Sequence, residues 1–146
     1  MMYFKKAGKH NSAETLETVK TAIKEKDIKY VVVASSNGHT AKLFAEAKLG
    51  VNLIWVTHAA GFRVPGEIEA AESLRNELSA AGVKVLTATH VLSGAERGIS
   101  NKAGGMYPIE IMANALRMMG QGTKVCVEVS VMALDAGLIP FGEDII

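Results

Sequence analysis

A run of small polar residues, Ser35-Ser36-Asn37-Gly38-His39-Thr40, has the composition of an anion-binding loop. It follows a β-branched apolar run and precedes a helical pattern, so its hydroxyl groups are expected beside the free N–H groups at a helix start, where phosphates bind. Gly38 would let the backbone approach a phosphate closely. A plain turn in which a Ser or Thr side chain caps the helix would leave the same pattern.

The absence of basic residues from this loop indicates which kind of phosphate it could bind. It contains no Lys or Arg, and the chain has no Gly-x-x-x-x-Gly-Lys-Ser/Thr pattern for gripping a nucleoside triphosphate. Neutral donors suffice for a monophosphate, because each hydrogen bond to a charged oxygen contributes about 1.5 to 3 kcal/mol. The loop therefore favours a phosphomonoester.

Two further polar pairs follow predicted strands, Thr57-His58 after the second and Thr89-His90 after the third. His39 follows the first strand, so the three imidazoles are expected at one rim of the sheet, where α/β proteins bind ligands. Histidine can act as an acid or a base near neutral pH. None of these histidines has the local spacing of a metal-ligand set, and we expect no metal site.

The segment after the third predicted strand adds Ser93, Gly94 and Arg97 to the candidate site. The Arg97 guanidinium has the geometry to bind a phosphate or carboxylate through two hydrogen bonds. An exposed Arg97 paired with Glu96 or with solvent explains the same residue equally well.

Two aromatic residues and the single cysteine receive different interpretations. Phe62, next to Gly61 in a predicted loop, is the better candidate for stacking on a flat ring. Trp55 lies within an apolar strand and is expected in the core. Cys126, between two valines, is expected to be a buried small apolar residue.

The elements that must position these residues alternate along the chain. Helices are predicted from a cap at Asn11 to Lys26, over 40–49 and from Pro65 to Gly82, and strands over 30–34, 51–56 and 83–87. Strands separated by helices imply right-handed crossovers in a parallel sheet with helices on both faces. The fold class is therefore α/β, with three layers.

The second half of the chain is less regular. Residues 93–105 are rich in glycine and serine and are interpreted as a long functional loop, and a helix is predicted to open near Pro108. Periodicity leaves residues 125–136 open between strand and helix. Residues 144–146 are interpreted as the beginning of another strand. No linker interrupts the chain, so residues 1–146 are expected to form a single α/β domain.

Composition excludes several classes of protein. The 146 residues are 49% hydrophobic and 21% charged, which argues against disorder and coiled coils. The longest apolar run is too short to cross a bilayer, and the first residues lack the apolar core of a secretory signal, so a cytoplasmic protein is expected. A net charge of +1 with dispersed Lys and Arg disfavours binding to nucleic acid or membranes.

Several blocks together resemble the stand-alone proteins that are similar to the carboxyl-terminal α/β domain of pyruvate kinase. The blocks are VVVASSNGHTA at 31–41, VTHAAGF at 56–62, THVLSG at 89–94, GGMYP at 104–108, and residues 3–4 and 125–138. The likeness runs the length of the chain.

This resemblance implies a mostly parallel sheet in a three-layer sandwich, a helix over 125–136 and a further strand after Asp144. The sequence ends there, so the expected domain lacks the last strand segment of the family, or a partner completes the sheet edge. In pyruvate kinases the similar loop holds a phosphate of a sugar bisphosphate effector, a role that maps onto residues 35–40. The resemblance brings no kinase activity, because the catalytic barrel has no counterpart here.

The sequence thus favours a binding protein for a phosphorylated small molecule, with flavin mononucleotide (FMN) as the leading ligand. One alternative is an enzyme that acts on a phosphosugar or a flavin-dependent oxidoreductase, with His58 or His90 as the acid or base. Another is a metabolite-sensing regulatory subunit in a homo-oligomer. Whether the chain is an enzyme stays open. The expected binding residues are Ser35, Ser36, Asn37, Gly38, His39, Thr40, Thr57, His58, Gly61, Phe62, Thr89, His90, Ser93, Gly94 and Arg97.

Overall fold

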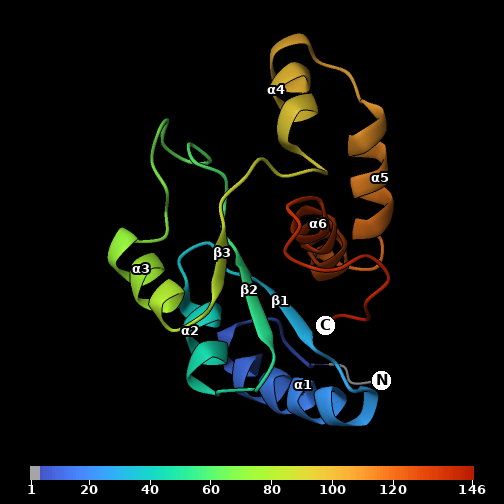
Figure 1. Cartoon of the computed structure of the whole chain (residues 1–146). Helices are drawn as coiled ribbons and strands as arrows, with labels where there is room; N and C mark the ends of the chain where they lie inside the picture. Colours follow the sequence, from blue (N-terminus) through green and yellow to red (C-terminus); the bar gives the residue numbers. More distant parts are fainter. Residues whose placement is uncertain (1–3) are drawn as a thin grey trace.

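The computed structural model describes residues 4–146 and contains a parallel sheet of three strands (Figure 1). The strands β1 (Tyr30–Ala34), β2 (Asn52–Val56) and β3 (Lys84–Leu86) pair in the order β1-β2-β3. Helix α2 (His39–Glu46) connects β1 to β2, and α3 (Glu72–Ala80) connects β2 to β3. The α/β class predicted from the sequence is confirmed.

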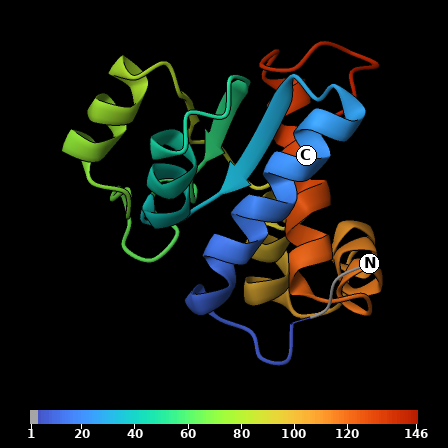
Figure 2. The ribbon, with the colours of Figure 1, turned by 90° about the horizontal axis from the view of Figure 1, so that it is seen from below.

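Helices cover both faces of this sheet. In Figure 2 the strands lie between α2 and α3 on one side and α6 (Gln121–Asp135) on the other. Helix α1 (Ser12–Lys26), preceded by a 3-10 turn over Lys9–Asn11, contributes to the core on the side of α2 and α3. The fold is therefore a three-layer sandwich.

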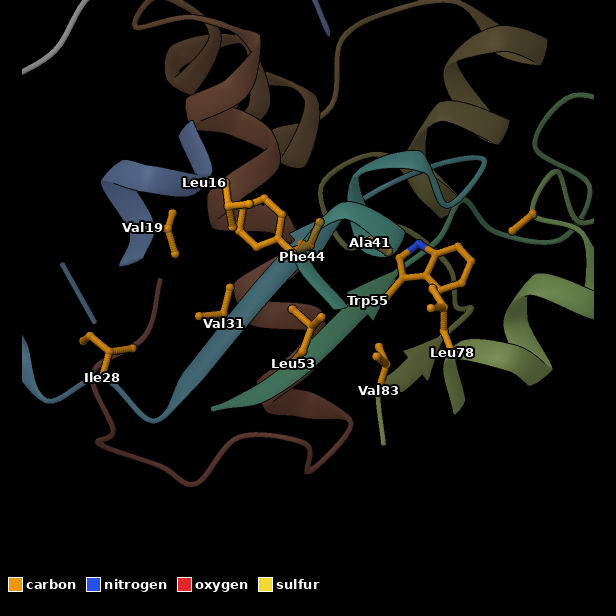
Figure 3. Packing of buried hydrophobic residues seen from close by; sticks show 12 residues of the cluster. Leu16, Val19, Ile28, Val31, Ala41, Phe44, Leu53, Trp55, Leu78 and Val83 are labelled. Atoms are coloured by element: carbon orange, nitrogen blue, oxygen red, sulfur yellow. The ribbon is translucent and has the colours of Figure 1, made fainter. Parts of the chain in front are cut away.

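The two cores explain why the strands lack apolar alternation. Val31 and Val33 pack in the cluster with α1 and α2, which Figure 3 shows, whereas Val32 packs against the cluster that includes α6. Trp55 is fully buried in the first cluster, and Ile54 is fully buried in the second. A strand covered on both faces needs apolar side chains at successive positions.

Helices α4 (Gly94–Ala103) and α5 (Pro108–Arg117) lie beyond the sheet, on the side of the molecule away from α1 (Figure 1). The interpretation of residues 93–105 as a loop is wrong, because most of them form α4. Helix α4 has no buried residue. Hydrophobic periodicity therefore could not reveal it, and its two glycines argued against a helix.

Several predicted boundaries need correction. The helix predicted from Pro65 begins at Glu72, and the preceding segment is a loop. Asn11 does precede α1, but its side chain does not cap the helix and its Nδ2 instead donates to the Lys6 carbonyl. The second helix ends at Glu46 rather than at residue 49, because Lys48 has a positive φ of 45°.

The end of the chain agrees with the remaining predictions. Residues 125–135 belong to helix α6, and Ala136 is its C-cap, so the helix that the resemblance implied is present. Ile145 bridges in parallel to Tyr30, and the Ile146 carbonyl accepts from the Val32 N–H at 2.6 Å. The chain thus begins a strand beside β1.

Cys126, however, is exposed on α6, so its predicted burial is wrong. No helix within residues 4–146 is long and apolar enough to traverse a bilayer.

Candidate functional site

A cavity of about 300 Å³ lies where the carboxyl ends of the strands meet α4, α5 and α6. This is the position at which open α/β sheets bind ligands. Each strand contributes the residues that follow it, and the three helices close the remaining walls. The lining residues are Ala34, Ser35, Ser36, Val56, Thr57, His58, Phe62, His90, Ser93, Arg97, Arg117, Gln121, Lys124, Val125, Glu128 and Val129.

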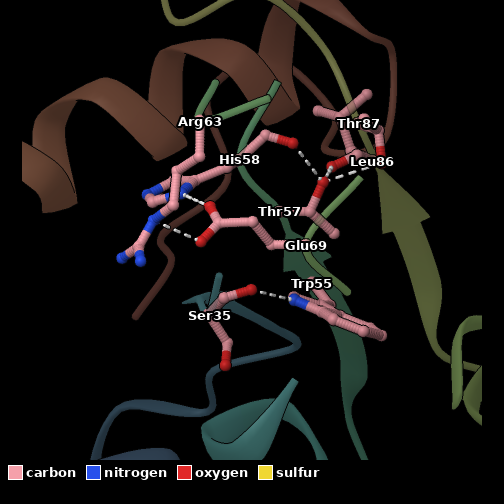
Figure 4. A network of polar contacts seen from close by, with 8 residues as sticks. All are labelled: Ser35, Trp55, Thr57, His58, Arg63, Glu69, Leu86 and Thr87. Carbon is pink, nitrogen blue, oxygen red and sulfur yellow. Dashed lines mark hydrogen bonds and ion pairs between the residues drawn. The ribbon is translucent and has the colours of Figure 1, made fainter. Parts of the chain in front are cut away.

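Trp55 fixes the loop after β1. Its buried Nε1–H donates to the Ser35 carbonyl at 2.7 Å (Figure 4). The Ser35 hydroxyl accepts from the Thr40 N–H at 3.3 Å, and the Asn37 Oδ1 accepts from the His39 N–H at 3.1 Å. The side chains of this loop therefore cap the start of α2, as the simpler of the two sequence interpretations required.

The loop does not point all six predicted residues at one place. Ser35 and Ser36 line the central cavity, whereas Asn37, Gly38 and His39 line a separate hollow beside α2. Of the three histidines predicted at one rim, only His58 and His90 line the central cavity, because His39 lines this other hollow.

Gly38 has a packing role that the sequence did not reveal. A Cβ at this position would lie 2.4 Å from Leu74 Cδ2 and 2.9 Å from Trp55 Cη2. Gly38 thus faces the core between α3 and β2, and its φ of 86° is one that other residues rarely adopt. Close packing and backbone conformation, not access for a phosphate, require glycine here.

A carboxylate and a guanidinium hold His58 from behind the cavity (Figure 4). The His58 Nδ1 bonds to one oxygen of Glu69, and the other oxygen accepts from the Arg63 Nε at 2.7 Å. His58 lines the cavity, whereas Glu69 and Arg63 do not. Because Glu69 binds Nδ1, the imidazole is held in one orientation with Nε2 left for other contacts.

Phe62 and His90 complete an aromatic cluster around His58. The Phe62 and His58 ring centroids are 4.0 Å apart with the planes inclined by 31°, and His90 lies 5.4 Å from both rings. Burial lowers the pKa of His90 below its ordinary value of 6.5, although the Glu128 carboxylate opposes this effect. His90 is therefore neutral at pH 7.

Thr57 joins two of the strand ends. Its hydroxyl lies 2.7 Å from the Thr87 hydroxyl and 2.8 Å from the His58 carbonyl, both within hydrogen-bond distance (Figure 4). Thr57 is almost fully buried. Its hydroxyl holds the loops after β2 and β3 together beneath the cavity.

The cavity wall formed by α6 carries a buried ion pair. Lys124 and Glu128, one helical turn apart, form a salt bridge with about 5% of each side chain exposed. The second Glu128 oxygen accepts from the Leu92 N–H at 2.9 Å and the Ser93 hydroxyl at 3.4 Å. This ion pair thereby connects α6 to the segment between β3 and α4.

Arg97 of α4 and Arg117 of α5 line the same cavity. Arg117 is oriented by Gln121, whose Oε1 accepts from Nε at 2.9 Å, and by Asn114, whose Oδ1 accepts from Nη1 at 2.7 Å. With Lys124, three cationic side chains and one carboxylate face the cavity. The wall is therefore suited to an anion.

The structure brings eight of the fifteen predicted site residues into the central cavity: Ser35, Ser36, Thr57, His58, Phe62, His90, Ser93 and Arg97. Thr89 and Gly94 line an adjoining cavity. Thr40 lies in α2, and Gly61 is a turn residue whose N–H donates to the Glu67 carbonyl.

Sequence reasoning missed the residues that helices α5 and α6 contribute. Lys124 and Glu128 were the detectable ones, because an oppositely charged pair at i and i+4 stands out in an otherwise apolar segment. Arg117 and Gln121 carried no such signal. Within residues 4–146 no group of three or more His, Cys, Asp or Glu side chains is arranged to hold a metal ion.

The parallel sheet, its two helical layers and the cavity at the strand ends define an α/β protein with a polar cavity at the carboxyl edge of the sheet. Comparison with known families matches residues 13–146 to the family described as pyruvate kinase, alpha/beta domain. The chain belongs to this family, and nearly all of it lies within the matched region.

Proposed function

We propose that this chain binds a phosphorylated small molecule in the central cavity, with FMN as the leading ligand. The observation that carries the proposal is the gathering of Arg97, Arg117 and Lys124 around one cavity at the strand ends. Hydrogen bonds from charged donors to phosphate oxygens are short and about twice as strong as neutral ones. A phosphate group would exploit these donors more fully than any neutral ligand.

Neutral donors support the same assignment. Ser35, Ser36 and Ser93 line the cavity together with the cationic side chains. The cavity volume of about 300 Å³ lies at the lower end of the range typical of small-molecule sites, about 300 to 1,000 Å³. Phe62, packed on His58, offers an aromatic surface for a flat ring system. A phosphoester with a planar ring, such as FMN, satisfies all of these groups.

The first experiment compares FMN with riboflavin, which has the same ring but no phosphate. The visible spectrum of the purified protein reports any retained flavin, and isothermal titration gives both dissociation constants. We expect FMN to bind at least tenfold more tightly, because its phosphate gains charge-assisted hydrogen bonds. Equal affinities, or no binding of either flavin or of inorganic phosphate, would contradict the proposal.

Variants locate the phosphate. Arg117→Met should weaken FMN binding by about ten- to a hundredfold, the loss expected for one hydrogen bond between charged groups. Lys29→Met removes one positive charge from an exposed residue outside the cavity and is the matched control. An Arg117→Met protein that binds FMN as tightly as the Lys29→Met control would place the phosphate elsewhere.

One observation favours an enzyme as the second candidate function. The Glu69 carboxylate orients His58, an arrangement that also keeps the Nε2 of a general base in position. In general acid–base catalysis on a phosphosugar, the His58 Nε2 would take a proton from the bound phosphosugar and return it in a later step. For a phosphosugar that the protein turns over, His58→Gln should abolish turnover with less than a threefold change in substrate Kd. Unchanged turnover would exclude this role.

A further inference from the structure

A second cavity, of about 450 Å³, lies next to the first. It is open to solvent on one side and is bordered by the end of β3, the segment that follows it, and parts of α4, α5 and α6. Most of the residues that line it are apolar: Leu86, Ala88, Val91, Ala95, Ile109, Met132 and Ala136. The central cavity, by contrast, is lined by hydroxyl, imidazole and charged groups.

His90 connects the two cavities, because it belongs to the lining of both. Burial lowers the pKa of His90 and so favours the neutral imidazole in this shared wall. A neutral imidazole does not repel an apolar group on one side and still offers a hydrogen bond to a polar group on the other. One molecule in contact with His90 would therefore meet a cationic wall and an apolar wall.

Four polar residues also line the second cavity, Thr89, His90, Glu96 and Asp135, and the Glu96 side chain is engaged elsewhere. The Glu96 carboxylate accepts from the Ile109 N–H at 2.8 Å and from the Glu110 N–H at 3.3 Å, which caps α5. Thr89 packs so closely on Gly94 that a Cβ at residue 94 would lie 2.1 Å from its Cγ2. Glycine at residue 94 therefore allows the close packing on Thr89 in the wall of the second cavity.

The volume of the second cavity sets the size of its occupant. An apolar cavity of about 150 Å³ accepts one benzene molecule. A cavity of about 450 Å³ has room for a group of several fused rings or an extended alkyl chain. Filling it removes apolar surface from water on both the protein and the ligand, which makes binding more favourable.

We propose that the second cavity binds the apolar part of the same ligand whose phosphate occupies the central cavity, with His90 between the two parts. This inference rests on the proposed function and specifies the ligand class as an amphipathic phosphoester, in contrast to a phosphosugar. A polycyclic ring and an alkyl chain share the chemistry that the cavity recognises, and the experiment below separates them.

The test is a titration series of methyl, butyl, hexyl and octyl phosphate, all below their aggregation concentrations, with 1-naphthyl phosphate and ribose 5-phosphate alongside. We expect the affinity to rise about threefold for each added methylene, the increment typical of apolar burial, while ribose 5-phosphate binds no better than methyl phosphate. Naphthyl phosphate binding more tightly than hexyl phosphate would identify a ring as the preferred group, and the reverse would identify a chain.

A matched pair of variants places the apolar group. Ala136→Trp fills the second cavity from the carboxyl end of α6, where the backbone has φ −78° and ψ 0°. Ala81→Trp makes the same change at the end of α3, at φ −79° and ψ 3° and outside both cavities, and is the control. We expect Ala136→Trp to abolish the dependence on chain length, with octyl phosphate binding reduced to the affinity of methyl phosphate.

The outcomes separate this inference from the proposed function. If methyl phosphate binds and chain length has no effect, the apolar subsite is wrong and the phosphate site stands. If octanol binds as tightly as octyl phosphate, the two cavities do not act on one ligand and the inference is overturned. If no phosphate compound binds, the proposed function itself fails. A chain-length effect that is equal in Ala136→Trp and Ala81→Trp would also overturn the inference.

Discussion

At the scale of single residues, Gly38 gives the sharpest prediction. Gly38→Ala places a methyl group against Leu74 and Trp55 at a positive φ, so overpacking adds to backbone strain. We expect a loss of about 2 to 4 kcal/mol in the free energy of unfolding, measured by urea denaturation. Gly50→Ala is the control, because Gly50 has a φ of 73° but nothing within 4 Å of the added Cβ. Equal losses in both variants would show that packing around Gly38 is unimportant.

The His90 imidazole predicts how stability depends on pH. Burial lowers its pKa in the folded state, so the unfolded chain binds more protons as the pH falls below 6.5. The contribution of neutral His90 is therefore fully present above pH 6.5 and is lost as the pH falls through the lowered folded-state pKa. Glu128 partly offsets this effect, whereas His58 and Lys124 reinforce it.

This pH dependence is measurable in two ways. Proton NMR should show a titration midpoint for His90 below 6.5, and urea denaturation between pH 7.5 and 5 should show a smaller loss of stability for His90→Gln than for the parent protein. His10→Gln is the control, since His10 is exposed near the start of α1. A His90 midpoint at or above 6.5 would contradict the assignment.

At the scale of elements, Glu96 links α4 to the start of α5. Its carboxylate accepts from the first N–H groups of α5, and a negative charge at a helix start also interacts favourably with the helix dipole. Glu96→Ala should lower the free energy of unfolding by about 1 to 2 kcal/mol. Glu14→Ala removes a first-turn carboxylate from α1, a helix with no side-chain cap, and should cost less. A loss of stability for Glu96→Ala no larger than that for Glu14→Ala would contradict the capping role of Glu96.

Elements with a buried face could be predicted from the sequence, and elements without one could not. Strands β1 and β2 could be predicted from their runs of successive apolar residues, which occur because both faces of the sheet are covered. Helix α4 has no buried residue, so its sequence carries no apolar stripe. The polar residues that follow strands, such as His58 and Ser93, were found because topology places strand ends together. Arg117 was missed because only the packing of α5 brings it to the cavity.

At the scale of the whole molecule, the Lys124–Glu128 pair joins the α6 layer to the strand ends. Lys124→Met leaves a buried carboxylate without its counter-charge, and Glu128→Gln leaves a buried ammonium group, so each should cost about 3 to 5 kcal/mol. The double variant removes both charges and keeps an acceptor for the Leu92 N–H. Its loss should be clearly smaller than the sum of the single losses. Additive losses in denaturation experiments would show that the two charges do not stabilise one another.

The α4–α5 unit should open more readily than the rest of the molecule. Helix α4 buries no residue and α5 buries only Ala113, whereas β2 has four buried residues in succession. Because local opening is least costly where few apolar contacts are lost, amide hydrogens of α4 should exchange at least a hundredfold faster than those of β2. Hydrogen exchange followed by mass spectrometry or NMR measures this difference.

Ligand binding should reduce the difference in amide exchange rate between α4 and β2. A phosphate bound between Arg97 of α4, Arg117 of α5 and Lys124 of α6 would contact all three helices, and it would lose these contacts whenever α4 and α5 open. Exchange in α4 and α5 should therefore slow by a factor of one plus the ratio of the ligand concentration to Kd, about a hundredfold at 100 times Kd. Amide exchange in the core strands should slow less wherever it occurs through local openings other than that of α4 and α5. Slowing confined to the loop after β1, with α4 unchanged, would place the anion at α2 and not among these helices.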